Sequence, residues 1–253
     1  MKIEEYLQSL PPSIMSGEEI QLQDNSIRDI LRFAKFGNDD VFYHLGCGSG
    51  NGLVIALAEF GAKKAVGVDK DKLKIEEAKN LLKEKGLKAE LRCQDVIEAD
   101  LSDASVILFW FSDTKIIEKM FERFQKLKLG CKIITIFDPL PGVLPQKVSF
   151  PYLLFEVPFK PAKDLKEQLV SIFETECMDF TTAWEYAERY TRAVGSPEAG
   201  NDRFLTILQT VMIWINARNL GLSCTKEIPA PVKAYIEILQ NFFNIEVSHL
   251  IKQ

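Results

Sequence analysis

Residues 42–69 read FYHLGCGSGNGLVIALAEFGAKKAVGVD, and this stretch decides the fold. An apolar run from Val41 to Leu45 enters a glycine-rich loop at 46–50, a helical pattern follows, and a second apolar run ends at Asp69. Glycines allow a ligand to approach the backbone closely, and the helix after the loop directs its free N–H groups at the same place. An acidic side chain about 20 residues further on can accept hydrogen bonds from two ribose hydroxyls. The stretch therefore predicts a site for a nucleotide-like ligand.

The spacing of the glycines excludes two common phosphate-binding loops. A dinucleotide loop has glycine at its first, third and sixth positions, but the sixth residue counted from Gly46 is Asn51. No Lys-Ser/Thr pair follows the glycines, which excludes the Walker loop. Glycine at every second position, followed by Gly67-Val68-Asp69, resembles instead the S-adenosylmethionine loop of class I, seven-strand methyltransferases. The alternative is a strand–turn–helix corner that binds nothing, and alternating glycines weaken such a corner.

The resemblance implies a set of cofactor-binding residues. Asp69 would bind the ribose, and Asp95 or its neighbouring backbone, after the third predicted strand, would bind the exocyclic amine of adenine. The family usually has Asp or Glu at the position of His44, and a neutral imidazole replaces some of those hydrogen bonds but not the charge. Structural alternatives are a solvated acid for Asp69 and a turn residue for Asp95. The expected cofactor-binding residues are His44, Gly46, Cys47, Gly48, Ser49, Gly50, Asp69, Lys70, Asp95, Val96 and Phe109.

Aromatic residues end the predicted fourth strand, 105–111, which in this family faces the transferred methyl group. Aromatic walls can hold an amine and its alkyl stem, and a carboxylate at the end of the fifth strand can orient an ammonium group. The alternatives are core packing for the aromatic rings and a cap of the Pro139 turn for the carboxylate. The expected acceptor pocket consists of Trp110, Phe111, Ser112 and Asp138.

Residues 25–160 resemble, more narrowly, the small archaeal seven-strand protein lysine methyltransferases and their eukaryotic relatives. The segments that carry this resemblance are IRDILRFAKFGNDDVFYHLGCGSG, AVGVDKD and GCKIITIFDPLPG. The chain departs from the family at His44, at Asn51, where Arg is usual, and at 21–25, where a Pro-rich segment is usual. The resemblance implies an S-adenosylmethionine-dependent enzyme that methylates a protein lysine. The alternatives are methylation of a small molecule, with the predicted helical residues 161–253 as a lid, and a non-catalytic binding module.

Methyl transfer to an amine needs little acid–base machinery, because the enzyme mainly positions a neutral amine in line with the sulfonium and excludes water. The catalytic residues are therefore left unassigned.

Alternating short strands and helices predict a doubly wound, mostly parallel, Rossmann-like α/β sheet over 26–160. An arm at 1–25 precedes it and an all-helical extension at 161–253 follows. The helices of this extension carry wide apolar stripes that must be buried, either beside the ends of the fourth and fifth strands, elsewhere on the sheet domain, or in a homodimer. The predicted strands are 41–45, 65–68, 87–93, 105–111 and 131–137, followed by one or two β-segments at 147–159, where the resemblance implies an antiparallel hairpin; the predicted helices of the extension are 162–178, 180–194, 202–219 and 231–244.

The composition indicates which partners and which cellular compartment to expect. A total of 31 Lys and Arg residues against 36 Asp and Glu residues argues against broad nucleic-acid binding. Five cysteines, at 47, 93, 131, 177 and 224, lie far apart without metal-ligand spacing, which predicts no metal site and no disulfide. We therefore expect a reduced, cytoplasmic compartment, and no apolar stretch is long enough to span a membrane.

Overall fold

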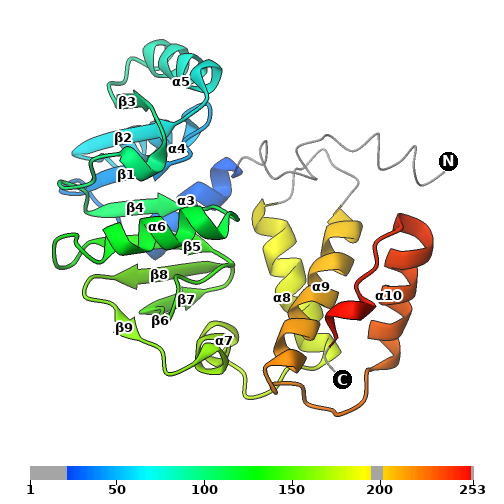
Figure 1. Ribbon diagram of the computed structural model, residues 1–253. Coiled ribbons are helices and arrows are strands. Elements are labelled where there is room, and N and C mark those ends of the chain that lie inside the picture. Colours follow the sequence, from blue (N-terminus) through cyan, green and yellow to red (C-terminus); the bar gives the residue numbers. More distant parts are fainter. Residues whose placement is uncertain (1–21, 195–201, 252–253) are drawn as a thin grey trace. The chain divides into compact units, whose positions relative to one another are not determined.

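The structure is a computed structural model that describes residues 22–194 and 202–251 (Figure 1). The chain divides into two compact units, of which the first is Leu22–Lys163 and the second includes the residues from Asp164 onward. Most of the predicted N-terminal arm lies outside the described residues, and so does 195–201, between two of the predicted helices.

A seven-stranded sheet with the order β3-β2-β1-β4-β5-β8-β7 forms the first unit. The first five strands in the chain run parallel, and β8 is antiparallel to both β5 and β7. This arrangement confirms the predicted doubly wound, mostly parallel sheet, and β7 with β8 forms the expected hairpin. The strands are β1 (Val41–Leu45), β2 (Lys64–Asp69), β3 (Glu90–Cys93), β4 (Val106–Phe109), β5 (Lys132–Ile136), β7 (Lys147–Ser149) and β8 (Tyr152–Glu156); a separate pair consists of β6 (Val143–Leu144) and β9 (Lys160–Pro161).

The strand order reverses between β1 and β4, which lie side by side at the centre of the sheet. Crevices that bind ligands open at such a switch point, beyond the carboxyl ends of the strands. The central strands are continuous apolar runs, as expected for strands covered on both faces. Their buried side chains include Phe42, Leu45, Val66, Val68, Ile107, Leu108, Ile133 and Ile134.

The helices of this unit are α3 (Asp24–Phe33), α4 (Asn51–Ala58), α5 (Lys72–Glu84) and α6 (Thr114–Phe124). An ion pair of 2.8 Å between Arg28 and Glu59 joins α3 to the end of α4, and α6 lies in front of the sheet in Figure 1. Asp71 caps α5 and Asp113 caps α6, each by accepting hydrogen bonds from backbone N–H groups of the first turn.

One expectation about these elements is wrong, and one apolar side chain lies outside the core. Leu73 is 74% exposed, because it lies in the first turn of α5 and outside the buried stripe of Ile75, Ala78 and Leu82. The fourth strand ends at Phe109, so Trp110 and Phe111 belong to the loop that follows it.

The second unit contains α7 (Leu165–Phe173), α8 (Phe180–Val194), α9 (Asp202–Asn219) and α10 (Ala230–Phe243), close to the predicted helices. The hydroxyl of Thr206 on α9 donates to that of Thr191 on α8 at 3.1 Å, and Trp214 is completely buried. The second unit thus has a core of its own, in which apolar side chains of these helices are buried. None of the helices in the described ranges is long and apolar enough to cross a membrane.

A disulfide joins Cys177 to Cys224, which contradicts the expectation that the chain has none. The two cysteines are 47 residues apart and lie in different loops, before α8 and after α9. Those loops meet because Met178 and Ser223 form an isolated β-bridge, and the Met178 N–H donates to the Leu222 carbonyl at 2.6 Å. The spacing of the cysteines in the sequence does not reveal that these two loops meet. The cytoplasmic location stays a prediction, and the expected absence of disulfides no longer supports it.

Candidate active site

The glycine-rich loop between β1 and α4 folds back onto the end of β2. The N–H groups of Gly46 and Cys47 both donate to the carbonyl of Val68, at 2.8 and 3.1 Å. Gly46, Gly48 and Gly50 have φ angles of 75°, 52° and 87°, which side-chain-bearing residues adopt only at a cost. A Cβ on Gly50 would also lie 2.8 Å from the Cβ of Ala78 on α5. The alternating glycines therefore serve backbone conformation and close packing together.

We expect Gly50→Ala to destabilise the sheet unit more than Gly142→Ala. Both glycines have positive φ, so both substitutions carry the strain of a left-handed residue, about 1–2 kcal/mol. Only at Gly50 does the new methyl group collide with a neighbour, because nothing lies within 4 Å of a Cβ at Gly142. Overpacking of this kind adds about 1–3 kcal/mol. Urea denaturation of the two variants measures the difference, and equal losses of stability would contradict the close contact between the loop and α5.

Asp69, at the end of β2, is anchored to the glycine loop. Its Oδ2 accepts a hydrogen bond from the N–H of Gly48 and its Oδ1 accepts one from the N–H of Asp71, both at 2.9 Å. A carboxylate oxygen has two lone-pair sites, so each oxygen retains one for a ligand hydroxyl. The carboxylate is thereby held at the loop in a fixed orientation. Its expected role as ribose ligand fits this geometry and stays a prediction.

Cys47 contributes its backbone to the loop and its side chain to the interior. The thiol is buried, and a Cβ on Gly67 of β2 would lie 2.8 Å from its Sγ. Burial, with a smaller effect of the Asp69 charge, raises the pKa of the Cys47 thiol to about 12. A thiol that stays protonated at neutral pH packs as a small apolar group.

His44 lies beneath the loop, against the first turn of α4. A Cβ on Gly52 would be only 2.6 Å from its Nδ1, and this nitrogen is buried without a hydrogen-bond partner in the described part of the chain. Burial lowers the pKa of His44 to about 4, so the imidazole is neutral at pH 7. An uncharged ring with an unsatisfied nitrogen thus occupies the place where the family usually has a carboxylate.

Asp95 and Val96 follow β3, where η1 (Val96–Glu98) forms a single 3-10 turn. Oδ1 of Asp95 accepts a hydrogen bond from the Ile97 N–H at 2.8 Å, so the carboxylate caps this turn. Asp95 therefore has the turn-forming role that was the structural alternative to ligand binding. Its second oxygen makes no hydrogen bond within the described ranges. Val96 is buried and Lys70, after β2, is exposed.

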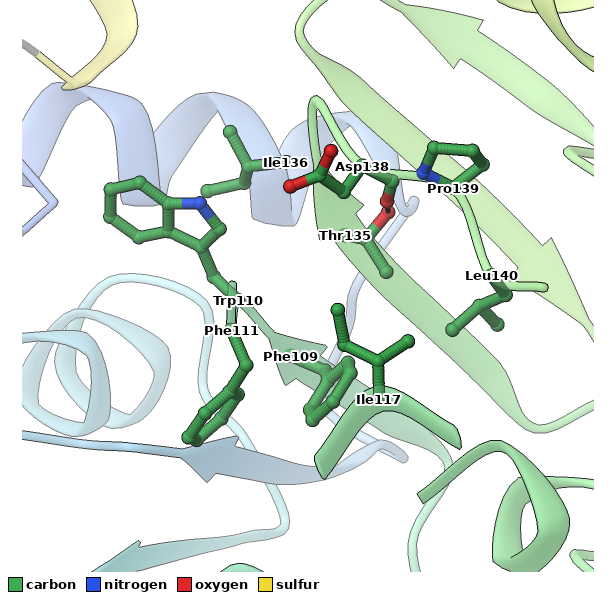
Figure 2. Close-up of a pocket in the computed structure, with 9 residues that line it drawn as sticks. All are labelled: Phe109, Trp110, Phe111, Ile117, Thr135, Ile136, Asp138, Pro139 and Leu140. Atoms are coloured by element: carbon green, nitrogen blue, oxygen red, sulfur yellow. Dashed lines mark hydrogen bonds between the residues drawn. The ribbon is translucent and has the colours of Figure 1, made fainter. Parts of the chain in front are cut away.

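A pocket opens at the ends of β4 and β5 (Figure 2). It contains three of the four expected acceptor residues and lacks Ser112, which is exposed in the adjoining loop. Asp138 is the one charged residue of its lining, and in Figure 2 its carboxylate lies at the same end of the pocket as the Trp110 indole. The lining consists of Phe109, Trp110, Phe111, Ile117, Thr135, Ile136, Asp138, Pro139 and Leu140.

Phe111 joins this pocket to the glycine loop. A Cβ on Gly46 would lie 3.2 Å from Cζ of Phe111, so the ring rests directly on the loop. On its other side the ring stacks on Phe109, with centroids 4.9 Å apart. Phe109 also packs edge-on against Phe124 and is 2% exposed, which shows the core role considered for it. The two expected sites, one for cofactor and one for acceptor, are thus adjacent.

The backbone at the end of β5 turns sharply to present Asp138. Phe137 has a φ of 68°, and its N–H donates to the carbonyl of Pro151 at 2.7 Å. The hydroxyl of Thr135 donates to the carbonyl of Asp138 at 2.7 Å and holds the turn closed. Asp138 is exposed at the mouth of the pocket, yet desolvation by the surrounding protein raises the pKa of its carboxyl group to about 6. Sequence reasoning missed Thr135, whose hydroxyl gave no signal within a buried strand.

Comparisons with known proteins identify the class to which the chain belongs. Residues 42–127 match a family described as a methyltransferase domain. The chain is 32% identical over 125 residues to a protein-lysine N-methyltransferase of Saccharolobus islandicus, a match that covers 48% of this chain and 77% of the relative. It is 36% identical over 85 residues to an uncharacterized protein of Methanocaldococcus jannaschii, covering 33% of this chain and 38% of that protein.

One solved structure resembles the sheet unit. It is an RNA methyltransferase from Salinibacter ruber in complex with S-adenosyl-L-homocysteine, which is 24% identical with a TM-score of 0.53 and covers 58% of this chain and 99% of that chain. At this identity the likeness concerns the fold alone.

The chain belongs to the class I S-adenosylmethionine-dependent methyltransferases. It is therefore an enzyme, and its methyl donor is S-adenosylmethionine. The residues present fit this cofactor, because the Asp69 carboxylate is anchored to the glycine loop with a lone-pair site left on each oxygen, and His44 has a buried nitrogen without a partner among the described residues.

Proposed function

We propose that this enzyme methylates lysine side chains of a protein. The observation that carries the proposal is the position of the aromatic pocket, whose Phe111 ring rests on the glycine loop and whose lining has the Asp138 carboxylate as its single charge. An alkyl stem with a cationic end matches apolar walls that carry one carboxylate. The identity to the Saccharolobus lysine methyltransferase supports the same acceptor.

The cofactor residues have separate roles in this proposal. Asp69 binds the ribose hydroxyls, Asp95 and the Val96 backbone bind the adenine edge, and the neutral His44 lies toward the amino-acid end of the cofactor. The N–H groups at the start of α4 complete the site.

S-adenosylmethionine supplies an electrophilic methyl group on a sulfonium. The chain itself places the acceptor nitrogen in line with that methyl group. Trp110 and Phe111 enclose the alkyl stem and exclude water, while the Asp138 carboxylate orients the incoming ammonium group and accepts a hydrogen bond from it at Oδ1 or Oδ2. The nitrogen must lose a proton before it attacks, and Asp138 at the pocket mouth faces solvent that can receive it.

Methyl-labelled S-adenosylmethionine tests the acceptor class. The enzyme is incubated with a cell extract of proteins, with the same extract after chemical acetylation of its lysines, and with total RNA. We expect label in the untreated protein and its loss after acetylation, with trimethyl-, dimethyl- or monomethyl-lysine detected by mass spectrometry. Label that survives acetylation, or that enters RNA instead, would refute the lysine proposal.

Asp138→Asn should raise the KM for the acceptor about tenfold, because one charge-assisted hydrogen bond is lost, while cofactor affinity stays unchanged. Since the pKa of Asp138 is raised to about 6, its carboxylate exists above that pH and becomes neutral below it. The advantage of wild type over the variant should therefore vanish as pH falls through 6. Asp113→Asn, in the loop after β4 and outside the pocket lining, is the matched control and should behave as wild type. A wild-type advantage that is constant with pH would exclude Asp138.

His44→Asp should tighten cofactor binding. The substitution introduces a carboxylate beside the first turn of α4, where helix N–H groups favour negative charge, and restores the charge that family members usually have there. Isothermal titration with S-adenosyl-L-homocysteine measures the change, and circular dichroism checks the fold. Weaker binding by a folded variant would mean that the imidazole makes a contact with the cofactor that a carboxylate cannot replace.

A further inference from the structure

Arg123, on α6, holds the segment that follows β3. Its Nη1 donates to the carbonyl of Val96 at 3.1 Å and to that of Ile97 at 2.5 Å, and its Nη2 donates to the carbonyl of Ala99. The guanidinium thus gathers three carbonyls of one short segment. It forms no ion pair with a carboxylate in the part of the chain that the structure describes. Neither its position nor its spacing in the sequence marked it as a functional residue.

The segment that Arg123 holds is fixed at both ends. At its start, Oδ1 of Asp95 accepts from the Ile97 N–H at 2.8 Å, and the Glu98 N–H donates to the Asp95 carbonyl at 3.0 Å. At its end, Arg123 donates to the Ile97 and Ala99 carbonyls and shares the Val96 carbonyl with the Ala99 N–H, which donates to it at 3.3 Å. A turn this short has little stability of its own, so external contacts determine where Asp95 and Val96 lie.

We propose that Arg123 is a positioning residue for the adenine subsite. It sets the orientation of the Asp95 carboxylate and of the Val96 backbone, and through them the enzyme's preference for the 6-amino group of adenine. The guanidinium acts from the far side of the segment and touches neither the cofactor nor the acceptor. This inference rests on the proposed placement of adenine at Asp95 and Val96 and is independent of the lysine acceptor.

Two ligands separate positioning from general stability. S-adenosyl-L-homocysteine carries the 6-amino group, and its inosine analogue has a carbonyl oxygen in place of that group. The ratio of their dissociation constants, measured by isothermal titration, shows how strongly the site prefers the 6-amino group to the carbonyl oxygen. Mere loss of folding stability lowers the melting temperature and reduces the competent fraction for both ligands equally, so it leaves this ratio unchanged.

The variants are Arg123→Met, Arg123→Lys and the matched control Arg92→Met. Arg92 also donates to a backbone carbonyl, that of Asp100 at 2.7 Å, just beyond the segment. We expect Arg123→Met to reduce the preference for the amino ligand by about tenfold, the effect of losing one well-oriented hydrogen bond. Arg123→Lys retains the charge but has no planar fork, and should reduce the preference by a smaller factor.

The outcomes are decisive for each variant. A preference that falls in Arg123→Met and stays within twofold of wild type in Arg92→Met supports the proposal. If Arg123→Met does not fold, Arg123→Lys decides by the same criterion. A preference unchanged at position 123, or a wild-type enzyme that binds both ligands equally, would overturn it. Methylation of RNA rather than protein would refute the lysine acceptor and leave this result intact.

Discussion

Asp69→Ala is expected to weaken the binding of S-adenosyl-L-homocysteine about a hundredfold or more. The wild-type carboxylate is held between the Gly48 and Asp71 N–H groups, and it retains a lone-pair site on each oxygen for the two ribose hydroxyls. Hydrogen bonds to a charged group contribute about 1.5–3 kcal/mol each before water compensates for their loss. Two such bonds, at the low end of that range, correspond to the expected factor. Isothermal titration gives the dissociation constants.

Asp71→Ala is the matched control for this experiment. Asp71 lies two residues from Asp69 and caps α5 by accepting from the Leu73 N–H at 2.8 Å, so its removal costs about 1 kcal/mol of stability. Its carboxylate makes contacts within α5 rather than with the glycine loop, and cofactor affinity should stay within twofold of wild type. Wild-type affinity in Asp69→Ala would show that the ribose lies elsewhere. Equal losses in the two variants would assign the effect to the start of α5 instead.

Removal of the Cys177–Cys224 disulfide should lower the free energy of unfolding of the helical unit by about 4 kcal/mol. The bond closes a loop of 47 residues, and the chain-entropy estimate for a loop of that length is about 4 kcal/mol. The doubly substituted variant Cys177→Ser/Cys224→Ser is compared with wild type by urea denaturation. In a Trp110→Phe background, fluorescence reports on the helical unit, because the two remaining tryptophans are Trp184 on α8 and Trp214 on α9.

Cys93→Ser provides the control for the loss of a thiol. Cys93 is an exposed free cysteine, and its replacement should change the free energy of unfolding by less than about 0.5 kcal/mol. A reducing agent should bring wild type down to the stability of the double variant and leave the double variant unchanged. Equal stabilities of wild type and double variant without reductant would show that the bond does not form or does not constrain the unfolded chain.

Local signals in the sequence were sufficient for the sheet and for the glycine loop. Three alternating glycines, the apolar runs on either side and Asp69 each specify a backbone conformation or a burial within a few residues. The parallel direction of the strands follows from the helices between them. For this reason β1, β2 and the helices of the tail lie close to where they were predicted, with errors of a few residues at their ends.

Predictions made from short stretches of sequence placed several side chains wrongly. Leu73 is apolar like the buried residues of α5, but it lies in the first turn, outside the stripe of Ile75, Ala78 and Leu82, and is exposed. Trp110 and Phe111 continue the apolar run of β4 without continuing its hydrogen bonds. Apolar character alone does not tell a strand residue from one that rests on a neighbouring loop.

The doubly wound sheet and the glycine loop could be predicted from the sequence, because neighbouring residues specify both. Only the tertiary structure decided which distant residues meet: Phe111 with Gly46, Arg123 with the turn after β3, and Cys177 with Cys224. Such meetings depend on how whole strands and helices pack, and many sequence separations are compatible with each. The chemistry of the pocket belongs to this second group, because Asp138 lies beside aromatic rings only when β4 and β5 are paired.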